Sequence, residues 1–353
     1  MDPKLPLELI DHIFTFLYFN RPTLSNCSLT RPRPRQWDIP NLPELLRFFH
    51  ETPSIAKHIR ILDIEGGCDQ IFAYWAQFGP EVFVDVVDAL PNLEEVVIDV
   101  ASIREQVEDK DIDNVVGYPE PRVPGRHLRS LMIGQATIEG DNPCLTLYHL
   151  LHSISSVKFL KIAGLSSSAD DTSVITIRNF AKKLYSSTNW HLDVEKLEWE
   201  YECDSGLFLV EMCRKSSPCK LRHLDFKYYD DPESDNRTAV AQEFLNDVGG
   251  GLESLSIALT GIQRSALDIS PCTSLRSLNF THDIFLRVEQ SFPTCFRSTL
   301  DSLSTVPRIP LKLTIKLGYF YIYEISQYIS SLSSLDWERF MRILNWHPCR
   351  MKK

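Results

Sequence analysis

Residues 221–226 read Leu-Arg-His-Leu-Asp-Phe, and residues 252–257 read Leu-Glu-Ser-Leu-Ser-Ile. Both stretches place apolar residues at the first, fourth and sixth positions of a six-residue motif. The motif occurs eight times, and its copies begin 34, 35, 29, 37, 27, 31 and 23 residues apart. Its apolar residues are Ile59/Leu62/Ile64, Leu93/Val96/Ile98, Leu128/Leu131/Ile133, Val157/Leu160/Ile162, Val194/Leu197/Trp199, Leu221/Leu224/Phe226, Leu252/Leu255/Ile257 and Leu275/Leu278/Phe280. Spacing of this size is typical of a supersecondary unit that buries its apolar face against its neighbours.

Each copy of the motif predicts a short strand, because side chains alternate along a strand and the fourth and sixth positions then share one face. Patterns typical of helices lie between the copies, over residues Pro80 to Leu90, Thr146 to Ile154, Ser205 to Cys213 and Thr238 to Val248, the last ending at the glycines 249–251. Strands that alternate with helices predict parallel strands with the helices on one side. A ninth strand is predicted at Leu311, Leu313 and Ile315, after a helix over 296–303.

This pattern resembles an irregular leucine-rich-repeat array. The resemblance implies an α/β solenoid with parallel strands on a concave face and helices outside. The family consensus places an asparagine three residues after the last apolar position of the motif, and this chain has none there. The equivalent positions hold Gly67, Ala101, Ala136, Leu165, Glu202, Tyr229, Thr260 and Asp283. The alternative is an α/β sandwich in which the periodicity arises by chance.

The N-terminal residues 5–17 predict an amphipathic helix that begins at a proline, where the missing N–H costs nothing. Residues 5–29, with L-P-L-E-L-I-D-H-I-F followed by R-P-T-L-S-N-C-S-L, resemble the F-box of fungal F-box proteins. The resemblance implies a short all-α segment that docks on a Skp-type adaptor and so joins a cullin ubiquitin ligase. Leu5 and Pro6 correspond to the residues that open the motif, and the helix face would be formed by Leu9, Ile10, Ile13 and Leu17.

The resemblance ends after Leu29, where the family continues with a further helix. Here Arg31, Arg33 and Arg35 alternate with Pro32 and Pro34, which forbid a helix and predict an extended linker. The F-box is therefore shortened. The domain organisation that follows is an F-box-like segment over 1–30, a linker and N-terminal cap over 31–54, a repeat solenoid over 55–318 and a C-terminal cap over 319–353.

Composition narrows the classes of function. The chain has 353 residues and a net charge of −10, and it shows no basic stripe, so we expect no nucleic-acid partner. No stretch approaches the ~20 apolar residues of a membrane span, so we expect no membrane partner. Nine scattered cysteines without a C-x-x-C pair fit reduced thiols of an intracellular protein, cytoplasmic or nuclear. Phosphate-binding, dinucleotide-binding, nucleophile-elbow and zinc-protease motifs do not occur, so we expect no catalytic residue, metal or cofactor.

The residues between the apolar positions of the motif predict a binding surface. If the fourth and sixth positions point inward, the fifth and seventh face the concave surface, where solenoids bind partners. Negative charge gathers there in the fifth and sixth copies, which favours a basic segment of a target. The predicted partner-binding residues are Lys161, Glu198, Glu200, Asp225 and Lys227. The alternative is that these are solvated charges of an acidic protein.

These observations predict a protein that is not an enzyme: the substrate-recognition subunit of a Skp–cullin–F-box ubiquitin ligase, which binds an unidentified protein substrate through its repeats. One alternative is a leucine-rich-repeat scaffold whose degenerate F-box recruits no ligase. Another is an α/β enzyme with an unrecognised site, which would require a closed pocket with convergent polar groups.

Overall fold

A computed structural model describes residues 42–68, 73–74, 76–104, 125–140, 142–167, 174–188, 190–201, 205–215, 220–229, 236–260, 267–284 and 312–319. The predicted F-box segment, with Leu5, Pro6, Leu9, Ile10, Ile13 and Leu17, lies outside the described residues, as do the helix predicted over 296–303 and the cap predicted beyond 319. The chain divides into two compact units, one formed by 1–192 with 203–212 and the other by 193–202 with 213–353. The predicted domain boundaries stay predictions.

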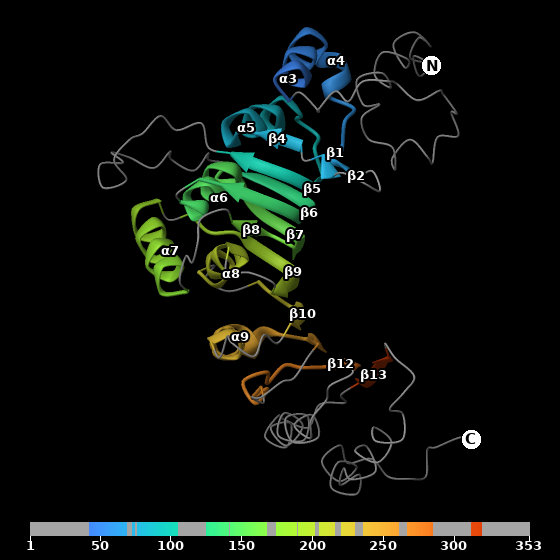
Figure 1. The fold of residues 1–353 in the computed structure, drawn as a ribbon, viewed down its shortest axis with the longest axis vertical. Coiled ribbons are helices and arrows are strands. Elements are labelled where there is room, and N and C mark those ends of the chain that lie inside the picture. Colours follow the sequence, from blue (N-terminus) through green and yellow to red (C-terminus); the bar gives the residue numbers. More distant parts are fainter. Residues whose placement is uncertain are drawn as a thin grey trace, which may run out of the picture. The chain divides into compact units, whose positions relative to one another are not determined.

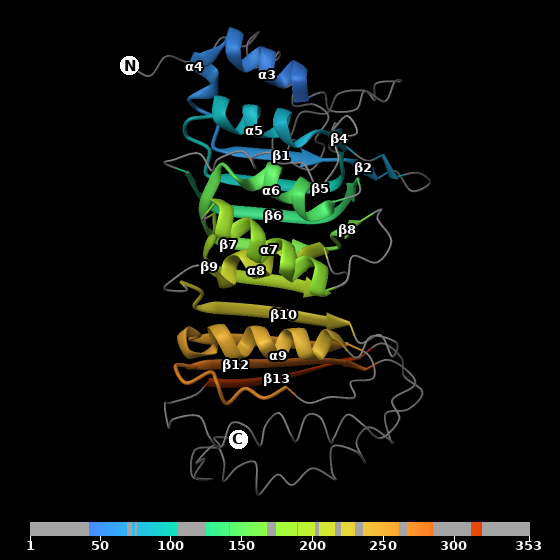
Figure 2. The same cartoon turned by 90° about the vertical axis from the view of Figure 1, so that its left-hand side faces the viewer.

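The first unit is a parallel sheet with helices on one face (Figures 1 and 2). Its main strands are β1 (Ile61–Glu65), β5 (Glu95–Arg104), β6 (Arg126–Glu139) and β7 (Ile154–Ala163), in that order across the sheet. Short strands are β2 (Gly67–Cys68), β3 (Ala73–Tyr74), β4 (Ala76–Phe78) and β8 (Ser166–Ser167). The helices are α3 (Leu42–Glu51), α4 (Pro53–Ala56), α5 (Pro80–Ala89), α6 (Pro143–Leu151), α7 (Val174–Thr188) and most of α8 (Ser205–Arg214).

The second unit repeats this arrangement. Its strands are β9 (Asp193–Tyr201), β10 (His223–Tyr229), β11 (Ser254–Thr260), β12 (Ser277–Ile284) and β13 (Lys312–Tyr319), and neighbours along the chain pair in parallel. Helix α9 (Asn236–Val248) continues into a 3₁₀ turn, η2 (Gly249–Gly251), before β11. Strand β13 is the predicted ninth strand, since Leu313 lies opposite Leu278 and Ile315 opposite Phe280. The prediction of an α/β fold with parallel strands is therefore confirmed.

Equivalent positions of the motif lie side by side in both units. In the first unit the fourth positions pair across the sheet in the order Leu62, Val96, Leu131 and Leu160. In the second the order is Leu197, Leu224, Leu255 and Leu278. All sixteen side chains at the fourth and sixth positions of the eight copies are at most 5% exposed. The predicted apolar core is confirmed, because the alternation of a strand turns both positions of every copy toward the helices.

Backbone hydrogen bonds fix this register where each strand begins. The carbonyl oxygen at the second position of one copy accepts from two N–H groups of the next copy, those at its second and third positions. For example, the oxygen of Arg60 accepts from Glu94 and Glu95 at 2.7 and 2.9 Å. The oxygens of Glu94, Arg222 and Glu253 do the same. A slip by one residue would break these bonds and turn the apolar positions to the other face.

Strands β5 and β6 turn a corner at the eighth position of the motif. Val100 and Gln135 have left-handed φ angles of 50° and 38°, and Gly164 has a φ of 61° at the equivalent position after β7. Before the corner, the even-numbered positions of the motif point to the helix side. The left-handed residue shifts this alternation by one, so that after the corner the ninth and eleventh positions point there instead. Four side chains at those positions, Ala101, Ile103, Ala136 and Ile138, have no exposed surface. The two strands continue beyond the corner and pair there with β4 and β8.

Most of the helices agree with those predicted from the sequence. The predicted helices at 80–90, 205–213 and 238–248 are confirmed as α5, α8 and α9. Helix α6 begins three residues before the predicted Thr146 because Asn142 caps it: its Oδ1 accepts from the N–H of Leu145 at 3.0 Å, and Pro143 follows. The predicted end of this helix at Ile154 was wrong, since Ile154 begins β7. Helix α7 was not predicted, although Ile177, Ala181 and Leu184 form its buried stripe.

We expect Gln135→Gly to raise the free energy of unfolding by about 1 kcal/mol. Gln135 is exposed and has a left-handed φ, which glycine adopts without the ~1–2 kcal/mol strain of other residues. Denaturant unfolding would measure the change. The matched control is Gln77→Gly, at an exposed position of β4 outside the left-handed region, which should instead lower stability by ~0.5–1 kcal/mol. If both substitutions lower the free energy of unfolding, the left-handed conformation of Gln135 would be wrong.

Candidate functional site

The candidate binding surface is the open face of each sheet, the side opposite the helices, formed by the third, fifth and seventh positions of the motif. Among the described residues, the helices that follow strands lie on the other side (Figure 1). Side chains at the fifth position are half-buried in all eight copies, as are those at the seventh except the fully buried Gly134. Half-buried side chains are held by their strand neighbours yet remain able to contact a partner.

Four of the five predicted partner-binding residues lie together on the open face of the second unit. Glu198 pairs in register with Asp225, and Glu200 with Lys227. The Nζ of Lys227 lies 3.6 Å from the Oε1 of Glu198 and 3.8 Å from the Oε2 of Glu200. The ammonium of β10 thus bridges both glutamates of β9. Lys161, the fifth predicted residue, lies half-buried on β7 in the first unit.

A hydrogen-bonded polar row extends this cluster along the fifth positions. Asp225 pairs in register with Ser256, which pairs with Asn279. The Nδ2 of Asn279 donates to the Oγ of Ser256 at 3.1 Å, and Ser256 forms a side-chain hydrogen bond with Asp225. Parallel strands in one register therefore connect three polar residues that lie 31 and 23 positions apart in the sequence.

Burial raises the pKa of Asp225 above its ordinary value, and the neighbouring Glu198 raises it further. The hydrogen bond with Ser256 and the charges of Lys227 and Lys196 act in the opposite direction. Two lysines, Lys196 and Lys227, thus offset part of the negative charge of the three carboxylates in the predicted patch. Three further acids of the sequence near the ends of these strands, Asp204, Asp230 and Asp231, lie outside the described residues.

The first unit carries carboxylates that the sequence reading did not select. Asp63 and Glu65 lie on β1, and Glu65 pairs in register with Asp99 of β5. Burial raises the pKa of Glu65, and Asp63 and Asp99 raise it further. Gly134 faces this group: a Cβ atom there would lie 2.8 Å from the Oδ1 of Asp99. The sequence already indicated this cluster, because Asp63 and Glu65 occupy the fifth and seventh positions of the first copy and Asp99 the seventh position of the second.

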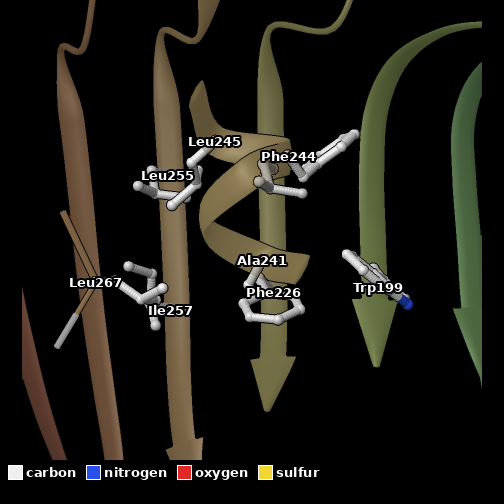
Figure 3. Close-up of a pocket in the computed structure, with 9 residues that line it drawn as sticks. Trp199, Phe226, Ala241, Phe244, Leu245, Leu255, Ile257 and Leu267 are labelled. Carbon is white, nitrogen blue, oxygen red and sulfur yellow. The ribbon is translucent and has the colours of Figure 1, made fainter. Parts of the chain in front are cut away.

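The ring of Trp199 belongs to the core, as its motif position predicted, and is 1% exposed. Its centroid lies 5.0 Å from that of Phe226 and 6.0 Å from that of Phe244 on α9. These rings border a small hollow between α9 and strands β9 to β11 (Figure 3). Among the described residues, the side chains that line this hollow are apolar or aromatic, namely Trp199, Leu224, Phe226, Ala241, Phe244, Leu245, Leu255, Ile257 and Leu267. None of these described residues directs a polar group into the hollow that could orient a substrate.

The cysteines Cys144, Cys213 and Cys272 are buried and form no disulfide. Burial raises the pKa of the Cys144 and Cys272 thiols to about 12, with a contribution from Asp268 at Cys272, so they are protonated and poor nucleophiles. Within the ranges that the structure describes, no group of three His, Cys, Asp or Glu side chains could hold a metal ion. In the same ranges, no helix is long and apolar enough to cross a membrane.

Comparison with known proteins adds no family: no protein-family model matches the sequence, and no curated protein matches it.

We expect Asp225→Asn to raise the free energy of unfolding at neutral pH. A carboxyl whose pKa is raised by folding holds its proton more tightly in the folded protein, so its ionisation destabilises the fold. That destabilisation is full above the raised pKa and absent below the ordinary value of 3.8. The stability difference between variant and wild type should therefore shrink as the pH falls, measured by urea unfolding at several pH values. Glu195→Gln, an exposed site on β9, controls for net charge; a difference that does not vary with pH would contradict the assignment.

Proposed function

We propose that this protein is the substrate-recognition subunit of a ubiquitin ligase of the Skp–cullin–F-box type, and that its repeat body binds the target protein. The main support is a combination within one chain. Residues 5–29 resemble an F-box, and the described strands beyond residue 60 form in-register parallel sheets whose open faces carry charged side chains. The first part would bind the Skp-type adaptor, and with it the cullin, while the second would select the target.

We further propose that the repeat body is an irregular leucine-rich-repeat solenoid. Support comes from the burial of the fourth and sixth positions in every copy and of the first position in all copies but the one that begins at Ile59. The left-handed eighth position of three copies adds to it. Where the family consensus places an asparagine, β5 and β6 have Ala101 and Ala136, both without exposed surface. An apolar ninth position, turned inward by the left-handed residue before it, would take the place of the amide.

The open face of the second unit is the proposed contact surface for the target. Its charged groups are held in place before binding: Lys227 bridges Glu198 and Glu200, and Ser256 holds Asp225. Side chains already ordered lose less conformational entropy when they bind. A target segment that bears basic residues is the complement, since carboxylates outnumber lysines in this cluster. Lys161 on the first unit would contact an acidic group of the same target.

We propose that the protein performs no catalysis itself, requires no cofactor and acts in the cytoplasm or nucleus. The groups with altered pKa values on the open faces, Glu65 and Asp225, are carboxyls on half-buried sheet surfaces. Among the described residues, the hollow beneath α9 has apolar walls. Neither arrangement offers the convergent polar groups of an enzyme pocket.

A second candidate function is a repeat scaffold that binds proteins without recruiting a ligase. Pro32 and Pro34 favour it, because they stand where the F-box family continues with a helix. The two functions share the target surface and differ only in whether the adaptor binds.

We expect the wild-type chain to co-purify with a Skp-type adaptor and Leu5→Asp/Pro6→Ala to lose at least about tenfold of the bound adaptor. A carboxylate placed in an apolar interface is desolvated without a partner, and removing ~1.4 kcal/mol already weakens binding tenfold. Quantitative pull-down from co-expressing cells would measure the loss.

The matched control is Ile175→Asp on α7, which places the same charge at an apolar side chain that is 71% exposed and should leave the adaptor bound. If the wild-type chain retains no adaptor, the ligase function is rejected and the scaffold function remains.

We expect charge reversal at the open face, with Glu198→Lys, Glu200→Lys and Asp225→Lys, to remove the proteins that the wild type captures through basic segments. Three like charges beside Lys227 would repel such a segment. Quantitative mass spectrometry of captured proteins would compare the variant with Glu81→Lys, Asp85→Lys and Glu243→Lys, exposed helix positions that give the same change in net charge. An identical set of captured proteins would reject the open face as the target surface.

A further inference from the structure

The second position of the motif is charged in every copy and forms a row of side chains where the strands of each unit begin. In the second unit the N–H of each of these residues donates to the carbonyl oxygen of the one before it, so they lie side by side. Their charges alternate in the order Glu195, Arg222, Glu253 and Arg276. Opposite charges on paired strands stabilise a sheet, whereas like charges directly opposite each other destabilise it.

The first unit departs from this alternation at β6 and β7. Its row begins with Arg60 and Glu94, which form an ion pair. The next two residues of the row, Arg129 and Lys158, are both basic. They stand opposite each other, because the residues directly before and directly after them pair in register between β6 and β7. Two positive charges thus lie side by side at a place where the row of the second unit has opposite charges.

The charges of these two residues are only partly compensated. The side chain of Arg129 is 71% exposed, and its Nη1 lies 3.5 Å from the Oε1 of Glu95. Lys158 is exposed, and among the described residues no carboxylate pairs with its ammonium. An anionic group bound between the guanidinium and the ammonium would remove their mutual repulsion.

A β-bulge directly before this pair adds an imidazole and a hydroxyl. Arg126 pairs with Ile154 but His127 pairs with Ser156, so Ser155 is an extra residue of β7. Bulges redirect side chains and are rare between parallel strands. The Nδ1 of His127 lies 2.6 Å from the Oγ of Ser156 and 3.4 Å from that of Ser155. The bulge thus holds an exposed imidazole through Nδ1 and leaves Nε2 for a ligand.

The close packing of the bulge requires glycine at position 125. A Cβ atom at Gly125 would lie 2.7 Å from the Cβ of Ser155 and 3.0 Å from its Oγ. The hydroxyl of Ser155 also donates to the carbonyl oxygen of Arg126 at 3.1 Å, which holds the extra residue in place. The sequence is therefore matched to the backbone that positions His127.

Strand geometry brings these groups onto one surface. Side chains two residues apart on a strand share a face, so His127 lies on the same face as Arg129, and Ser156 on the same face as Lys158. The register places His127 beside Ser156 and Arg129 beside Lys158. Imidazole, guanidinium, hydroxyl and ammonium groups therefore border one area at the start of β6 and β7.

We propose that this area, formed by His127, Arg129, Ser156 and Lys158, binds an acidic segment of a partner protein. One carboxylate would lie between Arg129 and Lys158. A second would accept from the Nε2 of His127, which carries the ring proton when the hydroxyl of Ser156 donates to Nδ1. Carboxylates two residues apart on an extended segment have the same spacing as His127 and Arg129, which are two residues apart on β6.

A short acidic segment fits this area better than a nucleic acid does. Glu94 and Glu95 border it on β5, so the positive charge does not extend across the sheet. A phosphate backbone requires a continuous basic stripe, whereas two carboxylates match two cations and one imidazole. Binding here requires neither the ligase adaptor nor the open face of the second unit.

The test titrates the full chain against the fluorescein-labelled peptide Gly-Asp-Glu-Asp-Glu-Asp-Gly and follows fluorescence anisotropy. The wild type should bind this peptide at least about tenfold more tightly than the amide counterpart Gly-Asn-Gln-Asn-Gln-Asn-Gly, which carries the same label. Arg129→Gln/Lys158→Gln should weaken binding of the acidic peptide on the order of tenfold, because both exposed ion pairs are lost.

Matched variants separate this site from general attraction between charges. Lys182→Gln/Lys183→Gln removes two exposed positive charges from α7 and gives the same change in net charge, and should leave binding unchanged. His127→Ala should weaken binding about threefold, whereas His50→Ala, at an exposed position of α3, should not. Circular dichroism of each variant establishes that it is folded.

Three outcomes would overturn the proposal. Equal affinity of the wild type for the acidic and the amide peptide, or no binding of either, would reject recognition of carboxylates. Unchanged binding by Arg129→Gln/Lys158→Gln would place the peptide elsewhere on the protein. An equal loss of binding in Lys182→Gln/Lys183→Gln would reduce the effect to net charge and reject this area as a site.

Discussion

The lateral pairing of equivalent apolar positions is the constraint on which the rest of the structure depends. Each fourth and sixth position lies beside its counterpart in the next copy, and together they form the inner face of each sheet. Burial of one such side chain stabilises the fold by about 1.5–3 kcal/mol relative to exposure. A slipped copy would expose its own apolar pair and also remove the neighbour's lateral contacts, so copies of unequal length are kept in a common register.

The common register brings polar side chains from copies of unequal spacing into defined positions on neighbouring strands. The segments between copies differ by up to fourteen residues, yet Lys227 lies within 4 Å of two glutamates on the neighbouring strand because motif positions, and not residue counts, determine the pairing. The same pairing produces the row from Asp225 to Asn279 and brings Glu65 beside Asp99. Function proposed for the open faces therefore depends on the same constraint as stability.

The corner at the eighth position shows how irregular copies adapt. Val100, Gln135 and Gly164 share the left-handed conformation although only the last is glycine. Strain of ~1–2 kcal/mol at a residue such as Val100 is offset by the burial that follows, where Ala101 and Ile103 return to the core. The second position of the motif is charged in all eight copies, and in the first two copies the charged residues form an ion pair, Arg60 with Glu94. The residues are Arg60, Glu94, Arg129, Lys158, Glu195, Arg222, Glu253 and Arg276. This regularity was visible in the sequence and was overlooked.

The sequence alone predicted the nine main strands, their parallel order and their buried positions, since a period of two and apolar spacing are local properties of the chain, but it did not predict the short strands β2, β3, β4 and β8. It also identified Trp199 as core and three of the helices. Only the tertiary structure decided that Lys227 offsets the predicted acidic patch, that Glu65 lies among carboxylates, and that Gly249–Gly251 end α9 as a 3₁₀ turn without a left-handed residue. Gly249 packs closely instead, since a Cβ there would lie 3.1 Å from the backbone of Pro271. Charge balance, pKa values and close approach arise from neighbours distant in sequence, which register brings together and composition cannot reveal.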